Sequence, residues 1–239
     1  MTYCVAMRLS GGLIFLADSR TNAGVDHIAT FRKLHSFSQP NERLLVMLSS
    51  GNLATTQSVI SLLQARLGQQ RPNLFNCATL FDVAELVGAT VREVISRDSG
   101  QQQSAVDFGC NFLIGGQIRG QSCELFHVYP EGNFIQATVD TPYFQIGEIK
   151  YGKPIIDRVI NFNTPLEHAT KCALISMDST IRSNLSVGMP LDLLIHRQGD
   201  LSSADYYSIS DNHPGFQQLQ EAWAIGLRQT FSTLPDIPL

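Results

Sequence analysis

Residues 1–7 of the chain read MTYCVAM, and residues 11–18 read GGLIFLAD. Apolar residues alternate loosely over residues 3–9, and a continuous apolar run over residues 13–17 ends at Asp18. Two such runs joined by a pair of Gly residues are typical of a tight hairpin of two strands. We therefore expect residue 2 to begin one strand and Asp18 to end its neighbour, so that the hairpin brings the two together.

The remainder of the chain divides into strands and helices by its hydrophobic spacing. Alternating or continuous apolar runs predict strands near residues 33–38, 43–48, 111–116, 124–129, 191–196 and 206–209. Spacings of three and four predict helices near residues 53–67, 79–97, 151–160, 165–182 and 214–231. Polar loops are expected at residues 19–24, with Gly24 available for a positive φ, and at residues 99–104. This order predicts an α+β fold of two sheets packed face to face with helices outside, in a single domain over residues 2–239.

The composition limits the class of protein. With 44% hydrophobic and 16% charged residues, the 239-residue chain is able to bury a sizeable core. A net charge of -4 without a cluster of Lys and Arg argues against nucleic-acid binding. The sequence has neither an apolar run long enough for a bilayer nor a secretory signal pattern, so we expect a cytoplasmic protein without membrane contact. The five scattered Cys predict buried thiols, and no motif calls for a metal or a cofactor.

Thr2 directly follows the initiator Met, so removal of that Met would expose a hydroxyl and a free α-amine in one residue. Such an amine ordinarily titrates at roughly 7.7–8.0, and its neutral form can take the hydroxyl proton. The site would also need a cation, an anion that holds the cation, and N–H donors for an oxyanion. Asp18, Lys33 and the pair Ser50 and Gly51 are candidates for these parts. The same residues are also typical of a turn acid, a solvated Lys and a helix N-cap, so spacing alone leaves both interpretations open.

The order of these candidates resembles a known superfamily. Residues 17–24 read ADSRTNAG, Lys33 follows, and residues 49–51 read SSG. This set is similar to the N-terminal half of catalytic proteasome β subunits and of the bacterial HslV protease. In those proteins an N-terminal Thr precedes an Asp-Ser-Arg segment, a Lys and a turn made of a small residue and Gly.

Three further segments resemble the bacterial proteasome-like family called Anbu. They are residues 1–6 (MTYCVA), 18–27 (DSRTNAGVDH) and 208–214 (SISDNHP). The resemblance covers nearly the whole chain and is strongest over residues 2–52. It implies a four-layer αββα sandwich of the N-terminal-nucleophile hydrolase type. It also implies self-association, as rings in proteasomes and HslV and as an open spiral of dimers in Anbu-like proteins, and it leaves an unfoldase partner undetermined.

The resemblance also implies roles for the candidate residues. Thr2 would be the nucleophile through its hydroxyl and the base through its amine. Asp18 would orient Lys33, Lys33 would lower the pKa of the amine, and a backbone N–H of Ser50 or Gly51 would form the oxyanion hole. The implied reaction is hydrolysis of a peptide or other amide bond in a peptide or protein substrate.

Beyond residue 52 the sequence departs from the β-subunit pattern. Glu148, after Gly147, stands where β subunits carry a Ser near the Thr amine. Ser183 and Ser186 stand where they carry an Asp and then a Ser, so the Asp is missing. Glu148 would either compensate or hold the amine protonated as a poor base. Two alternatives stay open: a catalytically inactive assembly subunit, and an amidase for a small or isopeptide-linked substrate. Independently of these alternatives, Glu148 is also typical of a turn acid, and Ser183 and Ser186 of polar residues at a helix end.

Overall fold

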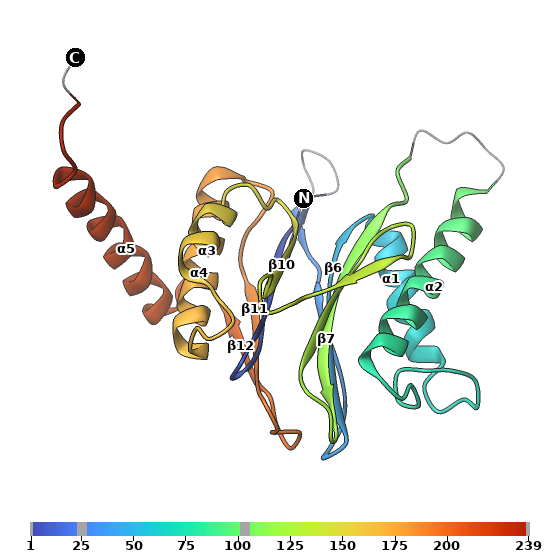
Figure 1. The fold of residues 1–239 in the computed structure, drawn as a ribbon. Helices are drawn as coiled ribbons and strands as arrows, with labels where there is room; N and C mark the ends of the chain where they lie inside the picture. The colour runs from blue at the N-terminus through green and yellow to red at the C-terminus, as the bar shows by residue number, and fades with distance from the viewer. Residues whose placement is uncertain (1, 23–27, 101–105, 238–239) are drawn as a thin grey trace.

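Two five-stranded antiparallel sheets pack against each other at the centre of the molecule (Figure 1). The computed structural model describes residues 2–22, 28–100 and 106–237. In spatial order, the first sheet contains β10 (Tyr143–Gly147), β1 (Tyr3–Leu9), β2 (Gly12–Asp18), β11 (Leu191–Arg197) and β12 (Asp205–Ile209). The second contains β5 (Leu34–Gln39), β6 (Arg43–Gly51), β7 (Cys110–Ile118), β8 (Glu124–Val128) and β9 (Phe134–Gln136).

Helices cover the outer face of each sheet. Helices α1 (Leu53–Ala65) and α2 (Leu80–Ser99) lie on the second sheet, and α3 (Lys153–Val159) and α4 (Leu166–Ser183) lie on the first. Helix α5 (Pro214–Ser232) lies outside α4 and points away from the sandwich (Figure 1). The predicted four-layer αββα arrangement is therefore confirmed. None of the described helices combines the length and the apolar character that a bilayer span requires.

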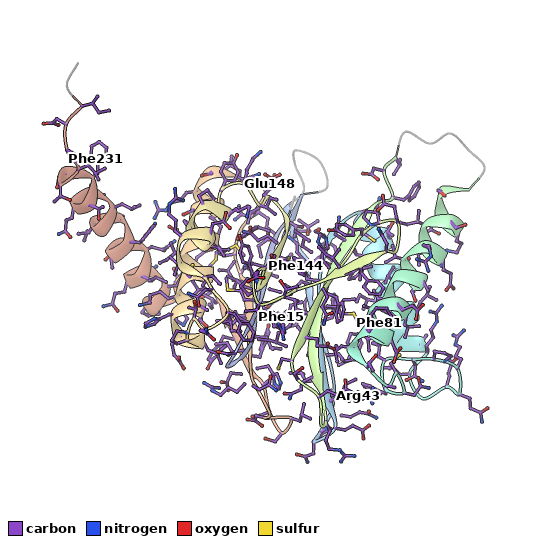
Figure 2. All side chains as sticks on the ribbon, viewed as in Figure 1. Phe15, Arg43, Phe81, Phe144, Glu148 and Phe231 are labelled. Carbon is purple, nitrogen blue, oxygen red and sulfur yellow. The ribbon has the colours of Figure 1, made fainter. Side chains whose placement is uncertain are left out.

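The first hairpin is buried on both faces. Cys4 and Ala6 of β1 face the second sheet, whereas Val5 and Met7 face the helices of their own side. On β2, Phe15 belongs to the layer between the sheets, and Figure 2 shows it there. Burial on both sides explains why both strands are largely apolar instead of alternating cleanly with polar residues.

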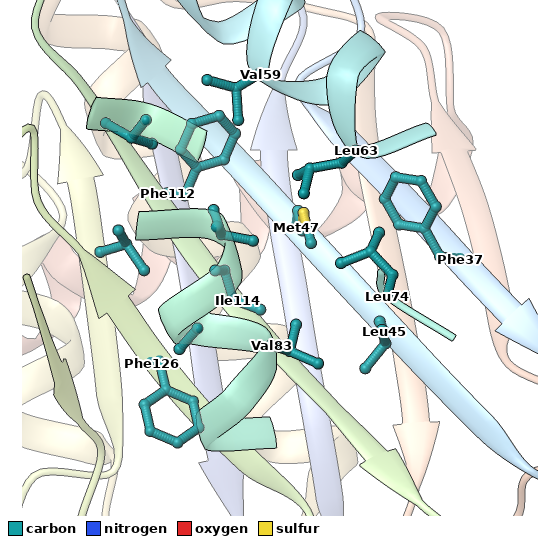
Figure 3. Packing of buried hydrophobic residues seen from close by; sticks show 14 of the residues in the cluster. Phe37, Leu45, Met47, Val59, Leu63, Leu74, Val83, Phe112, Ile114 and Phe126 are labelled. Atoms are coloured by element: carbon teal, nitrogen blue, oxygen red, sulfur yellow. The ribbon is translucent and has the colours of Figure 1, made fainter. Parts of the chain in front are cut away.

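The second sheet is fixed by a separate core beneath α1 and α2. Met47 and Phe112 point outward from β6 and β7 and pack against Val59, Leu63 and Val83 of the two helices (Figure 3). All five side chains are fully buried. Burying a side chain of this size stabilises a fold by roughly 1.5–3 kcal/mol. This core anchors β6, whose last residues reach the candidate site.

The structure changes the sequence prediction in three places. Residues 20–22 do not form a loop but a short strand, β3 (Arg20–Asn22), which pairs with β4 (Ile28–Thr30); Gly24 lies outside the described residues. Strand β10 was not predicted, because a five-residue strand is too short to show a clear period and its partner β1 lies about 140 positions earlier in the chain. The predicted polar loop at 99–104 starts later than expected, because Ser99 still belongs to α2; residues 101–104 lie outside the described residues.

Candidate active site

A cleft of about 620 Å³ opens at the end of the sandwich where β1 begins. Its walls come from both sheets and from the start of α1, and Thr2, Ser50, Asn111 and Glu148 are among the residues that line it. Figure 2 shows Glu148 at this end of the molecule. The pairing of β1 with β10 brings together Thr2 and Glu148, which are 146 positions apart, and the packing of the two sheets adds Ser50 and Asn111.

Thr2 is held in place by the end of β10. Its carbonyl oxygen accepts the Glu148 N–H at 2.8 Å, and the next residue, Tyr3, pairs with Gly147. Gly147 has a φ of +85°, and a Cβ atom there would lie 1.9 Å from the Thr2 carbonyl oxygen. Only Gly permits this approach, so the backbone of β10 determines where Thr2 lies. Met1 lies outside the described residues.

Asp18 and Lys33 form a buried ion pair, of which Lys33 lines the cleft. The Lys33 ammonium donates to Asp18 Oδ1 at 2.6 Å and to the Arg20 carbonyl at 2.7 Å. Asp18 Oδ1 also accepts the Tyr3 N–H at 3.0 Å, and Oδ2 accepts the Gly188 N–H at 3.3 Å. Burial raises the pKa of Asp18, whereas Lys33 and the two backbone N–H groups act to lower it. One carboxylate oxygen therefore connects the Lys33 ammonium to the amide bonded to Thr2.

Ser50 and Gly51 end β6 at the wall of the cleft. The next residue, Asn52, caps α1 through its side-chain oxygen, which accepts the Thr55 N–H at 3.1 Å. Gly51 has a φ of +104°, and a Cβ atom there would lie 2.4 Å from the Gly109 carbonyl oxygen. The cleft is therefore bordered by backbone at the positively polarised end of α1.

Comparison with known proteins identifies the family. The family model described as proteasome subunit matches residues 2–195. One similar solved structure is that of Anbu (ancestral β-subunit) from Yersinia bercovieri, which is 60% identical in sequence. The match covers 99% of this chain and 99% of that chain, with a TM-score of 0.94. The chain belongs to the proteasome-like Anbu family.

Other Anbu structures are similarly close. The helical assembly of the Anbu complex from Pseudomonas aeruginosa is 53% identical, with 99% of this chain and 98% of that chain covered and a TM-score of 0.95. A Gly-1 mutant of Anbu from Hyphomicrobium sp. strain MC1 is 50% identical over the whole of both chains, with a TM-score of 0.93. No curated protein matches the sequence.

Glu148 lies in the cleft of this Anbu-family chain, beside the Thr2 backbone. Its side chain is 15% exposed, and its carboxylate is 3.6 Å from the Lys150 ammonium. The structure therefore brings Thr2, Lys33, Ser50, Gly51 and Glu148 to one cleft, as the resemblance implied. Their catalytic roles remain predictions.

Ser183 and Ser186 are placed differently. Ser183 is exposed at the end of α4, and the Ser186 N–H donates to the Asn184 side-chain oxygen at 2.9 Å. Neither residue is among those that line the cleft. Their segment reaches the site through Gly188, which donates its N–H to Asp18. A direct catalytic role for the two Ser side chains also remains only a prediction.

Sequence reasoning missed several residues of the Anbu-family cleft. Arg32, His35, Gln57 and Asn111 line it, and they come from a loop, two strands and a helix. Arg32 could have been found from its position next to Lys33, but the others carry no local signal. All five Cys are buried, as predicted. Within the described ranges, no group of three or more His, Cys, Asp or Glu is placed to hold a metal ion.

Proposed function

We propose that the chain, after removal of Met1, is an N-terminal threonine hydrolase that cleaves peptide or other amide bonds. The observation that supports this most strongly is the buried Asp18–Lys33 ion pair, which shares an oxygen with the amide next to Thr2. A cation held at this position favours the neutral form of a nearby amine. Membership of the Anbu family supports the same type of chemistry.

The proposed reaction uses Thr2 for both steps. The neutral amine takes the hydroxyl proton while the oxygen attacks the amide carbon, and a backbone N–H of Ser50 or Gly51 stabilises the oxyanion. The proton then passes to the leaving nitrogen, the C–N bond breaks and a threonyl ester forms. Water, deprotonated by the same amine, hydrolyses the ester and restores Thr2.

Hydrolysis of a panel of peptide amides and small amides by purified, Met1-free protein tests this proposal. Release of the amine product, with a threonyl ester trapped on rapid acid quench, is expected for at least one substrate. Turnover restricted to small amides would favour the amidase alternative. Complete absence of turnover and of ester would favour an inactive assembly subunit.

We also propose that the chain associates with further copies of itself. The Pseudomonas aeruginosa relative forms a helical assembly, and α5 offers an apolar surface for such a contact. Of its residues, only Phe216 is buried, whereas Leu227 is 49% and Phe231 78% exposed. Figure 2 shows Phe231 at the end of α5 far from the sandwich. A second copy that covers this face would remove large side chains from water.

The double variant Leu227→Glu with Phe231→Glu should weaken self-association. Burying a fully exposed side chain of this size contributes about 1.5–3 kcal/mol, and Leu227 and Phe231 are partly exposed, so the association constant of the double variant should fall at least tenfold. Sedimentation velocity against protein concentration measures the shift to smaller species. Gln229→Glu, an exposed position on the same helix, is the matched control. Equal sedimentation of both variants and the wild type would exclude α5 from the contact.

Gly147→Ala should displace Thr2 and slow its reaction. The new methyl group would overlap the Thr2 carbonyl oxygen, and a displacement of about 1 Å can cost roughly 10²-fold in rate. The labelling rate of Thr2 by an electrophile is the measurement. Gly199→Ala is the control, since Gly199 has a φ of +88° with no atom within 4 Å of the new Cβ. It should carry the same strain of a positive φ without the clash, and it should not slow labelling. Equal labelling rates in the two variants would contradict the placement of Thr2.

A further inference from the structure

Most of the residues that line the cleft around Thr2 have polar or charged side chains. Of the fourteen described residues that line it, Leu53 alone has a purely hydrocarbon side chain of more than one carbon. The other side chains include Arg32, His35, Gln57 and Asn111. Ligand pockets usually rely on apolar walls with a few polar groups, so this lining does not suit an apolar substrate side chain.

Most of the charges in the cleft are already balanced. Lys33 pairs with Asp18 at 2.6 Å, and Glu148 lies 3.6 Å from the Lys150 ammonium. Burial lowers the pKa of His35 and the charge of Arg32 acts in the same direction, while Asp192 acts to raise it, so the net effect favours the neutral imidazole. These three groups therefore leave the cleft with little net charge of their own.

Arg32 is the exception. Its guanidinium lies over the Tyr206 ring, 5.8 Å from the ring centroid, and no carboxylate of the described residues is within ion-pair distance of it. The Tyr206 hydroxyl donates to Asp192 Oδ1 at 2.5 Å, which fixes the ring. Arg32 is exposed and also lines a smaller adjacent cavity of about 300 Å³ that includes His35 and Gln64. A guanidinium oriented on an aromatic ring keeps its N–H donors available for a bidentate contact with a carboxylate.

We propose that Arg32 selects substrates that carry an acidic side chain near the scissile amide, with the carboxylate bound at the junction of the two cavities. This assignment rests on the proposed hydrolase function for the identity of the scissile bond. The binding preference itself can be measured without turnover. A charge-assisted contact of this kind changes affinity by about tenfold.

The test uses binding to protein that carries Thr2→Ala, so that no reaction follows. Fluorescein-labelled peptides that differ only in one residue, Glu, Gln, Leu or Lys, are titrated and Kd is measured by anisotropy. We expect the Glu peptide to bind about tenfold more tightly than the Gln peptide. Adding Arg32→Ala should bring that ratio to one, Arg32→Lys should restore part of it, and Arg32→Glu should favour the Lys peptide.

Arg119→Ala is the matched control, because it also removes one exposed positive charge. Asn111 lines the cleft near the start of β7, whereas Arg119 follows the other end of the same strand. It should leave the ratio unchanged. Absent binding of the Glu peptide, or equal Kd values for the Glu and Gln peptides, would overturn the assignment even if Thr2 is labelled by an electrophile in the wild type. The two proposals can also fail separately in the other direction. If the Glu preference depends on Arg32 but Thr2 of the wild type does not react with an electrophile, the hydrolase proposal is overturned and the acidic-ligand site stays in place.

Discussion

Protein that carries Thr2→Ala is expected to lose amide hydrolysis and electrophile labelling down to the uncatalysed background. The substitution removes the side-chain hydroxyl of residue 2 and keeps the α-amine and the backbone contact with Glu148. Removal of a nucleophile from a working site costs at least roughly 10³-fold in rate. The measurement is the second-order rate of labelling by a β-lactone, together with turnover of any substrate found in the amide panel.

Two controls make this result specific to the hydroxyl. Thr2→Ser keeps the hydroxyl and should retain labelling, and the unfolding temperatures of all three proteins should agree. Intact masses must show that the initiator Met is removed to the same extent in each. Labelling of Thr2→Ala at the wild-type rate would mean that another nucleophile reacts, and the mechanism would be wrong.

Lys33→Met should lower the rate by roughly 10²-fold, within the range of general acid–base effects. Only part of this loss comes from protonation of the amine. An amine with its ordinary pKa of roughly 7.8 is still about one-third neutral at pH 7.5. The remainder reflects the lost positive charge beside an oxygen that becomes negative as it reacts. The acid limb of the pH–rate profile should therefore move up toward pH 8 in the variant.

Lys33→Met also leaves a buried charge without its partner. Asp18 is fully buried, and breaking such an ion pair costs roughly 3–5 kcal/mol of unfolding free energy. The double variant Lys33→Met with Asp18→Asn removes that charge as well, so it should recover stability but not activity. Recovery of both would mean that Lys33 acts only by holding the fold together. An acid limb that does not move in the single variant would exclude an effect of Lys33 on the amine.

The local hydrophobic pattern was sufficient to predict elements whose partners lie nearby in the sequence. The hairpin of β1 and β2 follows from two apolar runs around a Gly pair, and it correctly brings Asp18 to the Tyr3 amide. The helices α1, α2 and α4 follow from their spacing, because each buries one face on a sheet. These predictions depend on contacts that local sequence determines.

The rest of the site depends on pairings that no local pattern contains. Gly147 and Glu148 reach Thr2 only because β10 pairs with β1, and Asn111 enters the cleft because β7 pairs with β6. Arg32 acquires its position from Tyr206 on β12, far along the chain. Glu148, which lines the cleft, was suggested by the resemblance to proteasome subunits and not by spacing, and its role stays a prediction.

The N-terminal peptide of protein isolated from cells and treated with a threonine-directed electrophile provides the most direct test of the proposed mechanism. Tandem mass spectrometry should show a peptide that begins at Thr2 and carries one adduct on that residue. A peptide that still begins at Met1, or an unmodified Thr2 with the adduct on another residue, would contradict the proposal that Thr2 is the nucleophile.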